Sequence, residues 1–112
     1  FEHLRDLRAR VAARTGAPER VGFCLDTCHV HSAGYDLSTR DLARAALAEF
    51  DALCGLAHVK VWHLNDSKAP AGSRRDLHQH VGDGTIGRSP RRVAESGFAE
   101  VLALPGVERV PK

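Results

Sequence analysis

Two stretches decide how this sequence is expected to fold: CLDTCH at Cys24–His29 and HLNDSK at His63–Lys68. Each stretch lies at the end of an apolar run, Val21–Leu25 or Val59–Leu64, that has the length and composition of a buried strand. Asp and His side chains therefore lie at the ends of two successive predicted strands. Barrel enzymes keep their metal ligands at such strand ends, so this placement predicts a metal site rather than ordinary core.

Helices are predicted around these strands because apolar residues recur at helical spacing. One helix is predicted over residues 2–15, and a second begins after Ser38 or Thr39 and stops at Gly55. Helices and strands then alternate along the chain. This order implies an α/β fold with a parallel sheet and helices outside it.

The last part of the chain is less regular. Residues 65–88 are polar and rich in Gly, and they are too long for an ordinary connection, which indicates a functional loop. A third helix is predicted within residues 89–104, with Ser89-Pro90 as its start. Residues 107–112 are predicted to begin a third strand.

Length and composition limit the class of protein. The 112 residues suit one modest domain, which we place at residues 1–112. The net charge of +2 is too small to indicate a nucleic-acid-binding protein by itself. Three Cys, an odd number, argue against a disulfide scaffold and favour a reducing compartment, so we expect a cytoplasmic protein. No apolar run approaches the roughly 18 residues that a membrane span needs, so no membrane partner is expected.

The two ends of the sequence predict a piece of a longer protein. The sequence has no Met, Phe1 lies inside a predicted helix, and the last residues break off in a strand-like run. We therefore expect the domain to be incomplete at both ends.

Five Asp and His residues are the candidate metal ligands. Asp26 and His29 are three residues apart where a strand gives way to a loop, so both can project over the same rim, and His63 closes the next strand. Asp76 and His78 are two residues apart, and residues i and i+2 point to the same side of an extended segment. A mixture of carboxylate and imidazole suits zinc, or manganese where carboxylates and water dominate.

Each candidate also has an ordinary structural interpretation. An Asp at a strand end often caps the turn that follows, and a His is often a hydrogen-bonded core or surface residue; His31 and His80 fit either use. The Cys24-x-x-x-Cys28 spacing suggests a structural zinc site, but it is long for a zinc knuckle and no second Cys pair is present. We therefore expect Cys24, Cys28 and Cys54 to be small buried apolar groups.

The chain resembles the C-terminal portion of the endonuclease IV family, the metal-dependent apurinic/apyrimidinic endonucleases. The resemblance rests on GFCLDTCH at 22–29, AGYD at 33–36, NDSK at 65–68, Gly72-Ser73, Asp76, His78 and GDG at 82–84. Val110-Pro111-Lys112 adds to it, because in the family such a tripeptide leads into a strand that carries a ligand Glu. Leu77 departs from the Arg that is usual in the family beside the metal-binding Asp and His.

The resemblance implies that this chain is a fragment of a (β/α)8 TIM barrel, about three of its βα units. It implies three Zn²⁺ ions at the carboxyl ends of the strands, with Mn²⁺ as an alternative at one site. Asp26 and His63 would serve one zinc, and His29, Asp76 and His78 another. No catalytic residue is expected beyond these metal ligands.

The implied activity is hydrolysis of the DNA backbone 5′ to abasic sites in double-stranded DNA, carried out by a monomeric full-length protein. Lys68, Arg74 and Arg75 lie on the long loop and are candidates for holding DNA phosphates, which positions a strand without reading its sequence. A solvated loop is the alternative for these three cations. The family's remaining ligands, two His and a bridging Glu before Phe1 and a Glu after Lys112, fall outside the sequence.

Two other functions stay open. A sugar isomerase or epimerase of the related divalent-metal barrels also places Asp, His and Glu at strand ends, but it gives no reason for the basic loop. A non-enzymatic zinc module with nucleic-acid affinity would need tight zinc binding by Cys24 and Cys28.

We predict that the isolated 112 residues neither fold into a stable monomer nor cleave DNA. A barrel closes by pairing its first and last strands, so a three-strand piece keeps two open sheet edges, and it lacks part of the ligand set. Hydrogen exchange and nicking of an abasic duplex, both with zinc present, check this. A cooperative monomeric unfolding transition together with zinc-dependent nicking would contradict it.

Overall fold

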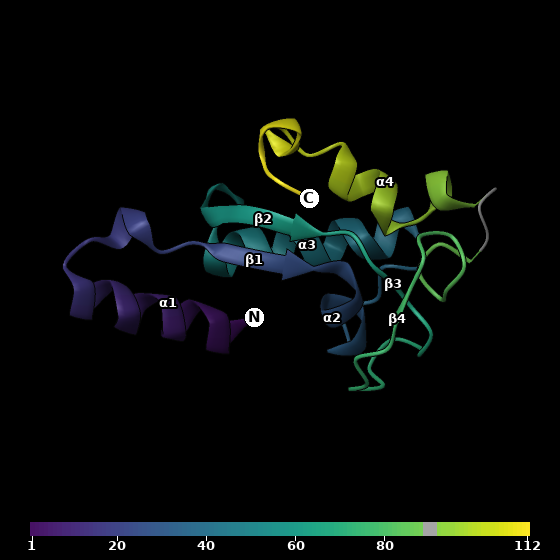
Figure 1. Cartoon of the computed structure of the whole chain (residues 1–112), viewed down its shortest axis with the longest axis horizontal. Helices are drawn as coiled ribbons and strands as arrows, with labels where there is room; N and C mark the ends of the chain where they lie inside the picture. Colours follow the sequence, from purple (N-terminus) through teal and green to yellow (C-terminus); the bar gives the residue numbers. More distant parts are fainter. Residues whose placement is uncertain (89–91) are drawn as a thin grey trace.

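The centre of the fold is a pair of parallel strands, β1 (Phe23–Asp26) and β2 (Val59–His63) (Figure 1). Strand β1 begins two residues after the predicted Val21, and β2 ends one residue before the predicted Leu64. The register places Asp26 opposite His63. The carboxyl ends of the two strands therefore lie side by side.

Helical segments precede and follow both strands. The structure is a computed structural model that describes residues 1–88 and 92–112. Its α-helices are α1 (Glu2–Thr15), α2 (Thr27–Ser32), α3 (Arg40–Cys54) and α4 (Gly97–Leu102), and its 3-10 turns are η1 (Pro18–Arg20), η2 (Leu56–His58), η3 (Val93–Glu95) and η4 (Val107–Arg109). The bounds of α1 match the prediction, and α3 begins after its cap Thr39 and ends before Gly55, as predicted. None of the helices in the described ranges is long and apolar enough to cross a membrane.

Helix α2 replaces the loop that was expected after β1. The backbone N–H groups of Cys28 and His29 both donate to Asp26 Oδ1, at 2.9 and 3.4 Å. A carboxylate at this position satisfies N–H groups that a helix start leaves unpaired. Asp26 therefore caps the segment that follows it, as an Asp at a strand end often does, and the capped segment is a helix rather than a turn.

The C-terminal part differs more from its prediction. Ser96 caps α4, and Gly97, expected inside a helix, is its first residue; the predicted start at Ser89-Pro90 lies outside the described residues. The strand predicted over 107–112 begins as the turn η4, because Gly106 adopts a left-handed φ of 83° and closes a turn there. At Pro111 the backbone of this segment bonds to β2: the Trp62 N–H donates to the Pro111 carbonyl at 2.9 Å.

One face of the strands carries the core. Figure 1 shows α3 behind the two strands, with α1 and α4 to either side. The buried side chains of this layer are Phe23, Leu25, Phe50, Cys54, Val59, Trp62, Val101 and Val107. The rings of Phe23 and Phe50 meet edge to face with centroids 5.5 Å apart, which joins β1 to α3.

In the part of the chain that the structure describes, no helix covers the other face of the strands (Figure 1). Side chains alternate along a strand, so Cys24 and Asp26 point away from the layer that holds Leu25. Cys24 is exposed, and its prediction as a buried apolar group was wrong because this alternation places it on the open face; Cys28 and Cys54 are buried as predicted. In a closed barrel, the face opposite the helices is the interior.

The long loop folds into a two-stranded antiparallel ribbon, β3 (Asp66–Ser67) with β4 (His78–Gln79). Asp66 anchors the remainder of the loop. Its Oδ1 accepts from the N–H groups of Ser67 and Ile86, and its Oδ2 from those of Gly82 and Gly87, all at 2.8–3.0 Å. Nothing in the spacing of the sequence distinguished this residue from a solvated loop Asp.

The packing around the Asp66 carboxylate leaves no room for a side chain at Gly84 or Gly87. A Cβ atom at Gly84 would overlap the Asp66 carboxylate, and one at Gly87 would lie 2.8 Å from Asp66 Oδ2. Backbone therefore packs directly on the carboxylate. A fully buried charge of this kind is tolerated because four N–H donors surround it.

We predict that Asp66→Asn lowers the free energy of unfolding by about 3 kcal/mol, because an amide NH2 would face N–H donors and leave them unpaired. Urea unfolding of the complete gene product measures this, and hydrogen exchange should show lost protection at Gly82, Ile86 and Gly87. Asp83→Asn, on the exposed part of the same loop, is the control and should change stability by less than about 0.5 kcal/mol. Equal stability of the two variants would refute the anchoring role.

Candidate metal centre

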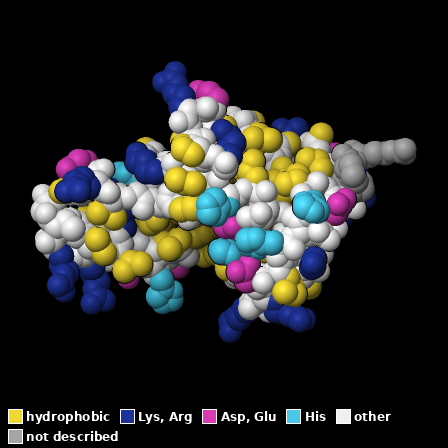
Figure 2. Space-filling view, viewed as in Figure 1, with side chains coloured by type: hydrophobic (Ala, Val, Ile, Leu, Met, Phe, Trp, Pro, Cys, Tyr) yellow, Lys and Arg dark blue, Asp and Glu magenta, His cyan; other side chains and the backbone are white. Residues whose placement is uncertain are grey.

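The five predicted ligands gather at the carboxyl ends of β1 and β2. We call them the Asp/His cluster: Asp26, His29, His63, Asp76 and His78. Asp26 and His63 close the two strands, His29 lies on α2, and the other two come from the long loop. Figure 2 shows His and acidic side chains side by side near the middle of the face presented. Residues 26 and 78, which are far apart in sequence, therefore share one site.

Three members of the cluster lie at the spacing of metal ligands. His29 Nε2 lies 3.4 Å from His78 Nε2. Asp76 reaches both rings, at 3.1 Å from His29 Nε2 and 2.9 Å from His78 Nε2. Zinc bonds near 2.0–2.1 Å in a tetrahedron would separate ligand atoms by about 3.4 Å. The two Asp76 distances are made by different oxygens, Oδ2 toward His29 and Oδ1 toward His78. Asp26, His29 and His78 each offer one ligand atom within 4.8 Å of the others, and the same holds for Cys28, Asp76 and His78. The imidazole and carboxylate donors of the cluster suit a divalent ion.

The other two members form a second pair that touches the first group. His63 Nδ1 lies 3.5 Å from Asp26 Oδ2, and His78 Nε2 lies 3.7 Å from the same oxygen. The Asp26 side chain is 5% exposed, whereas that of His63 is 55% exposed. Asp26 is thus the buried anchor of the cluster, and the imidazoles open toward solvent.

Asn65 completes the surroundings of Asp26, and no role of its own was predicted for it within the NDSK motif. Its Nδ2 donates to Asp26 Oδ2 at 2.7 Å. Thr27 holds it in place: the Thr27 hydroxyl accepts from the Asn65 N–H at 2.9 Å and donates to the Asn65 carbonyl at 2.6 Å. The signals in the sequence were its place in the NDSK motif and its position just beyond the end of a predicted strand.

Helix α2 fixes the loop that carries Asp76 and His78. The carbonyls of His31 and Ser32 accept from the N–H groups of Gly72 and Arg74, at 3.0 and 2.9 Å. The Ser32 hydroxyl donates to the Arg75 carbonyl at 2.8 Å. The loop is therefore bound to the same helix that presents His29.

The structure decides between the two uses left open for His31. The ring is buried, and the Leu37 N–H donates to its Nδ1 at 3.1 Å, so the proton sits on Nε2, which faces Thr85 Oγ1 at 3.2 Å. Burial lowers the pKa of His31, and the nearby carboxylates of Asp36 and Asp66 oppose this in part. A neutral imidazole with both nitrogens bonded within the fold is a structural residue. His80 is exposed, and the hydrogen bonds found for it in residues 1–88 and 92–112 are made by its backbone: its N–H donates to Gln79 Oε1, and its carbonyl accepts from the Asp83 N–H.

The three predicted phosphate-binding cations are exposed on the loop beside the cluster. Lys68, Arg74 and Arg75 have no carboxylate within 4.0 Å among residues 1–88 and 92–112. Arg74 adopts a left-handed φ of 56°, held by its N–H bond to Ser32. The side chains are therefore available to an anion, while their backbone is fixed.

The cysteines are not paired with one another. Cys24 Sγ lies 3.7 Å from His63 Nε2, whereas Cys28 Sγ lies within 4.8 Å of ligand atoms of Asp76 and His78. No group of three candidate ligands in the described residues contains both thiols. The geometry thus gives no support to the alternative of a structural zinc site built on both cysteines.

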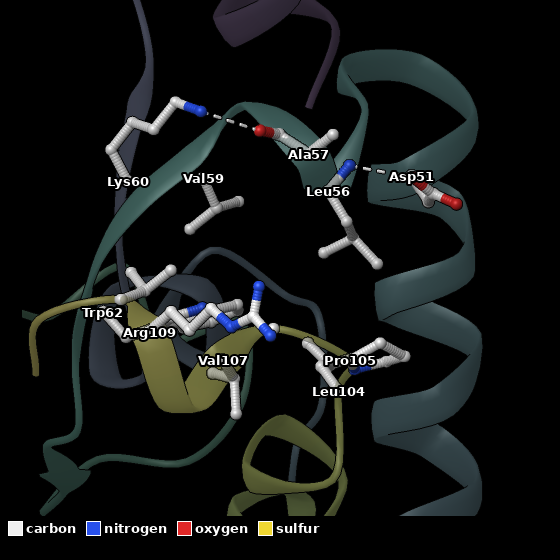
Figure 3. Close-up of a pocket in the computed structure, with 12 residues that line it drawn as sticks. Asp51, Leu56, Ala57, Val59, Lys60, Trp62, Leu104, Pro105, Val107 and Arg109 are labelled. Carbon is white, nitrogen blue, oxygen red and sulfur yellow. Dashed lines mark hydrogen bonds between the residues drawn. The ribbon is translucent and has the colours of Figure 1, made fainter.

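A separate groove of about 570 Å³ lies along β2, between it and the C-terminal segment, and shares no lining residue with the Asp/His cluster (Figure 3). Val59, Lys60 and Leu56 line one side of it, and Val107 and Arg109 of the C-terminal segment line the other. The Asp/His cluster is at the carboxyl end of the same strand. Since barrel active sites lie at carboxyl ends, the groove is not part of the candidate centre.

Comparison with known proteins shows what this chain is similar to. A probable endonuclease 4 of Solibacter usitatus is 42% identical over 111 residues, which cover 99% of this chain and 35% of that protein. A probable endonuclease 4 of Cenarchaeum symbiosum is 47% identical over 93 residues, 83% of this chain and 33% of that protein. The chain thus spans about a third of the length of the curated relatives it matches.

The chain is also similar to a solved structure. The chain superposes on endonuclease IV from Thermus thermophilus with a TM-score of 0.69 and 34% identity, covering 96% of this chain and 35% of that one. A family model described as xylose isomerase-like TIM barrel matches residues 1–104. The predicted α/β fold from a TIM barrel and the resemblance to endonuclease IV are both confirmed, and the chain belongs to the xylose isomerase-like TIM barrel family.

Proposed function

We propose that this chain is part of a DNA repair endonuclease that hydrolyses the phosphodiester bond 5′ to abasic sites in double-stranded DNA. The observation that carries the proposal is the Asp/His cluster, whose nitrogen and oxygen atoms lie at metal-ligand spacings at the ends of two parallel strands. The names of the relatives support a nuclease.

His29, Asp76 and His78 would hold one divalent ion, and Asp26 with His63 would contribute to a second. Zinc suits this mixture of imidazole and carboxylate, with manganese as an alternative. When bound, such ions supply a Lewis acid that neutralises charge on a phosphoryl oxygen and lower the pKa of water near the phosphorus. Ligands beyond these five would come from other strands of a complete barrel.

The residues of the chain itself orient this chemistry. Asp26 is fixed by the backbone of α2, and the backbone of the loop that carries Asp76 and His78 is bound to α2 as well, so the Asp26 carboxylate and this backbone are in place before any ion binds. Such preorganisation keeps the reacting groups from having to rearrange during the reaction. Lys68, Arg74 and Arg75 would bind phosphates of the DNA strand beside the cluster.

A sugar isomerase or epimerase is the second candidate, because the matching family model is described as xylose isomerase-like. Strand-end Asp and His ligands serve that chemistry equally well. The exposed cations on the loop favour the nuclease, because a neutral ketose has no charge for them to bind. Turnover of ketoses by the complete gene product, without cleavage of abasic DNA, would favour the isomerase.

We predict that Asp26→Asn, His63→Ala or His78→Ala lowers the rate of nicking at an abasic site by more than about 100-fold, because losing a ligand costs more than losing one of its supporting contacts. The assay uses the complete gene product, an abasic duplex and added zinc. His80→Ala is the matched control, since His80 is an exposed His of the same loop outside the cluster. Full activity of Asp26→Asn or His78→Ala would refute the ligand assignment.

We predict that Arg74→Ala or Arg75→Ala weakens binding to the abasic duplex regardless of the flanking sequence. Each lost phosphate contact should also reduce the slope of log affinity against log salt by about one unit. Titrations at several salt concentrations measure this. Arg20→Ala, an exposed Arg on η1 distant in sequence from the loop, is the control. A slope that neither loop variant changes would assign both residues to a solvated loop.

A further inference from the structure

We propose that Asn65 is a positioning residue of the metal centre: its side-chain amide orients the Asp26 carboxylate so that Oδ2 presents a free lone pair to the ion. The inference rests on the proposed function, because it concerns a ligand that Asp26 would supply there. It adds a residue from the end of β2 that binds no ion itself and acts through Asp26.

The contact is short and its direction is unambiguous. Asn65 Nδ2 lies 2.7 Å from Asp26 Oδ2. A carbonyl oxygen at that distance from a carboxylate would be repelled, so the NH2 end of the amide must face Asp26. Because the acceptor is a carboxylate that is 5% exposed, this hydrogen bond is of the strong, charge-assisted kind.

The hydrogen bonds of the Asp26 carboxylate leave one of its acceptor positions open. A carboxylate offers about four acceptor positions. The N–H groups of Cys28 and His29 take two of these on Oδ1, and Asn65 takes a third on Oδ2. Of the described residues, His63 Nδ1 and His78 Nε2 lie next to Oδ2 on the side that is left, at 3.5 and 3.7 Å. The fourth position therefore points to where an ion shared with these imidazoles would lie.

Asn65 is itself immobilised, as a positioning residue must be. The Thr27 hydroxyl is buried and bonds both the N–H and the carbonyl of Asn65. Thr27 directly follows Asp26, so the residue that Asn65 orients and the residue that holds Asn65 are neighbours in sequence. The backbone clamp does not involve the amide, and the side chain can be changed while the clamp is kept.

Substitution of the amide separates positioning from a general contribution to stability. Partners that orient a metal ligand typically change metal affinity by 10- to 100-fold. We expect Asn65→Ala to weaken, by about that factor, the binding of the zinc ion that depends on Asp26. Asn65→Leu keeps the volume of the side chain but cannot donate, and it should have the same effect.

The experiment uses the complete gene product and its variants. It measures zinc affinity by competition with a chelator, and it measures the number of zinc ions bound per protein. The variant His63→Ala should lose the ion that Asp26 and His63 share, and this loss identifies that ion. Gln79→Ala is the matched control, because Gln79 is a carboxamide of the same loop whose Oε1 accepts from the His80 N–H. Urea unfolding of the zinc-free proteins measures stability independently.

Four outcomes are distinguished. Selective weakening of the ion marked by His63→Ala, in Asn65→Ala and Asn65→Leu but not in Gln79→Ala, supports the inference. Wild-type zinc binding by both Asn65 variants, with the ion lost in His63→Ala, overturns it and leaves the proposed function intact. Loss of the fold in both Asn65 variants assigns Asn65 to stability and also overturns it. Unchanged zinc binding in His63→Ala removes the ion assigned to Asp26 and His63 and overturns the inference, and if His78→Ala also binds zinc as the wild type does, the proposed function fails with it.

Discussion

Asp26 lies opposite His63 because β1 and β2 pair in parallel and in one register. The pairing is irregular between Phe23 and Cys24 and regular from there to the carboxyl end. A slip of one residue would turn Asp26 toward the helices and Leu25 toward the open face, since side chains alternate along a strand. The core contacts of Leu25 and Trp62 oppose such a slip. The same packing that stabilises the sheet therefore places the candidate ligands.

The Asp26 carboxylate joins local structure to the site. One oxygen starts α2 by accepting from two of its N–H groups, and the other faces Asn65, His63 and His78. A buried carboxylate is costly unless its lone pairs are satisfied, and the helix start supplies this without using the oxygen that faces the cluster. Capping and ligation are thus compatible in one residue, because its two oxygens point in different directions.

The long loop owes its shape to buried polar groups rather than to apolar packing. Asp66 is completely buried under four backbone N–H groups, and the His31 imidazole and the Thr85 hydroxyl bond further parts of the same loop. Fully satisfied polar networks of this kind specify one conformation, because each unmade bond would leave a buried group unpaired. Buried polar groups therefore hold together the two ends of this Gly-rich loop, from which Asp76 and His78 extend.

Periodicity and strand-end placement were enough to predict the helices α1 and α3, the strands β1 and β2 to within two residues, and the five members of the Asp/His cluster as residues of one rim. These features depend on residues close in sequence, whose spacing carries the signal. Helix α2, the turn at Val107 and the exposure of Cys24 were not predicted, although their causes are local: the Asp26 cap, the left-handed Gly106 and the alternation of side chains along β1. The roles of Asn65 and Asp66, in contrast, depend on partners that local spacing does not reveal. Asn65 meets Asp26 from 39 positions away, and Asp66 is surrounded by amides 16 to 21 positions further on. Local sequence determined which side chains stand at the strand ends, and only the tertiary structure decided which hydrogen bonds hold them there, because those bonds form between segments that the fold alone brings together.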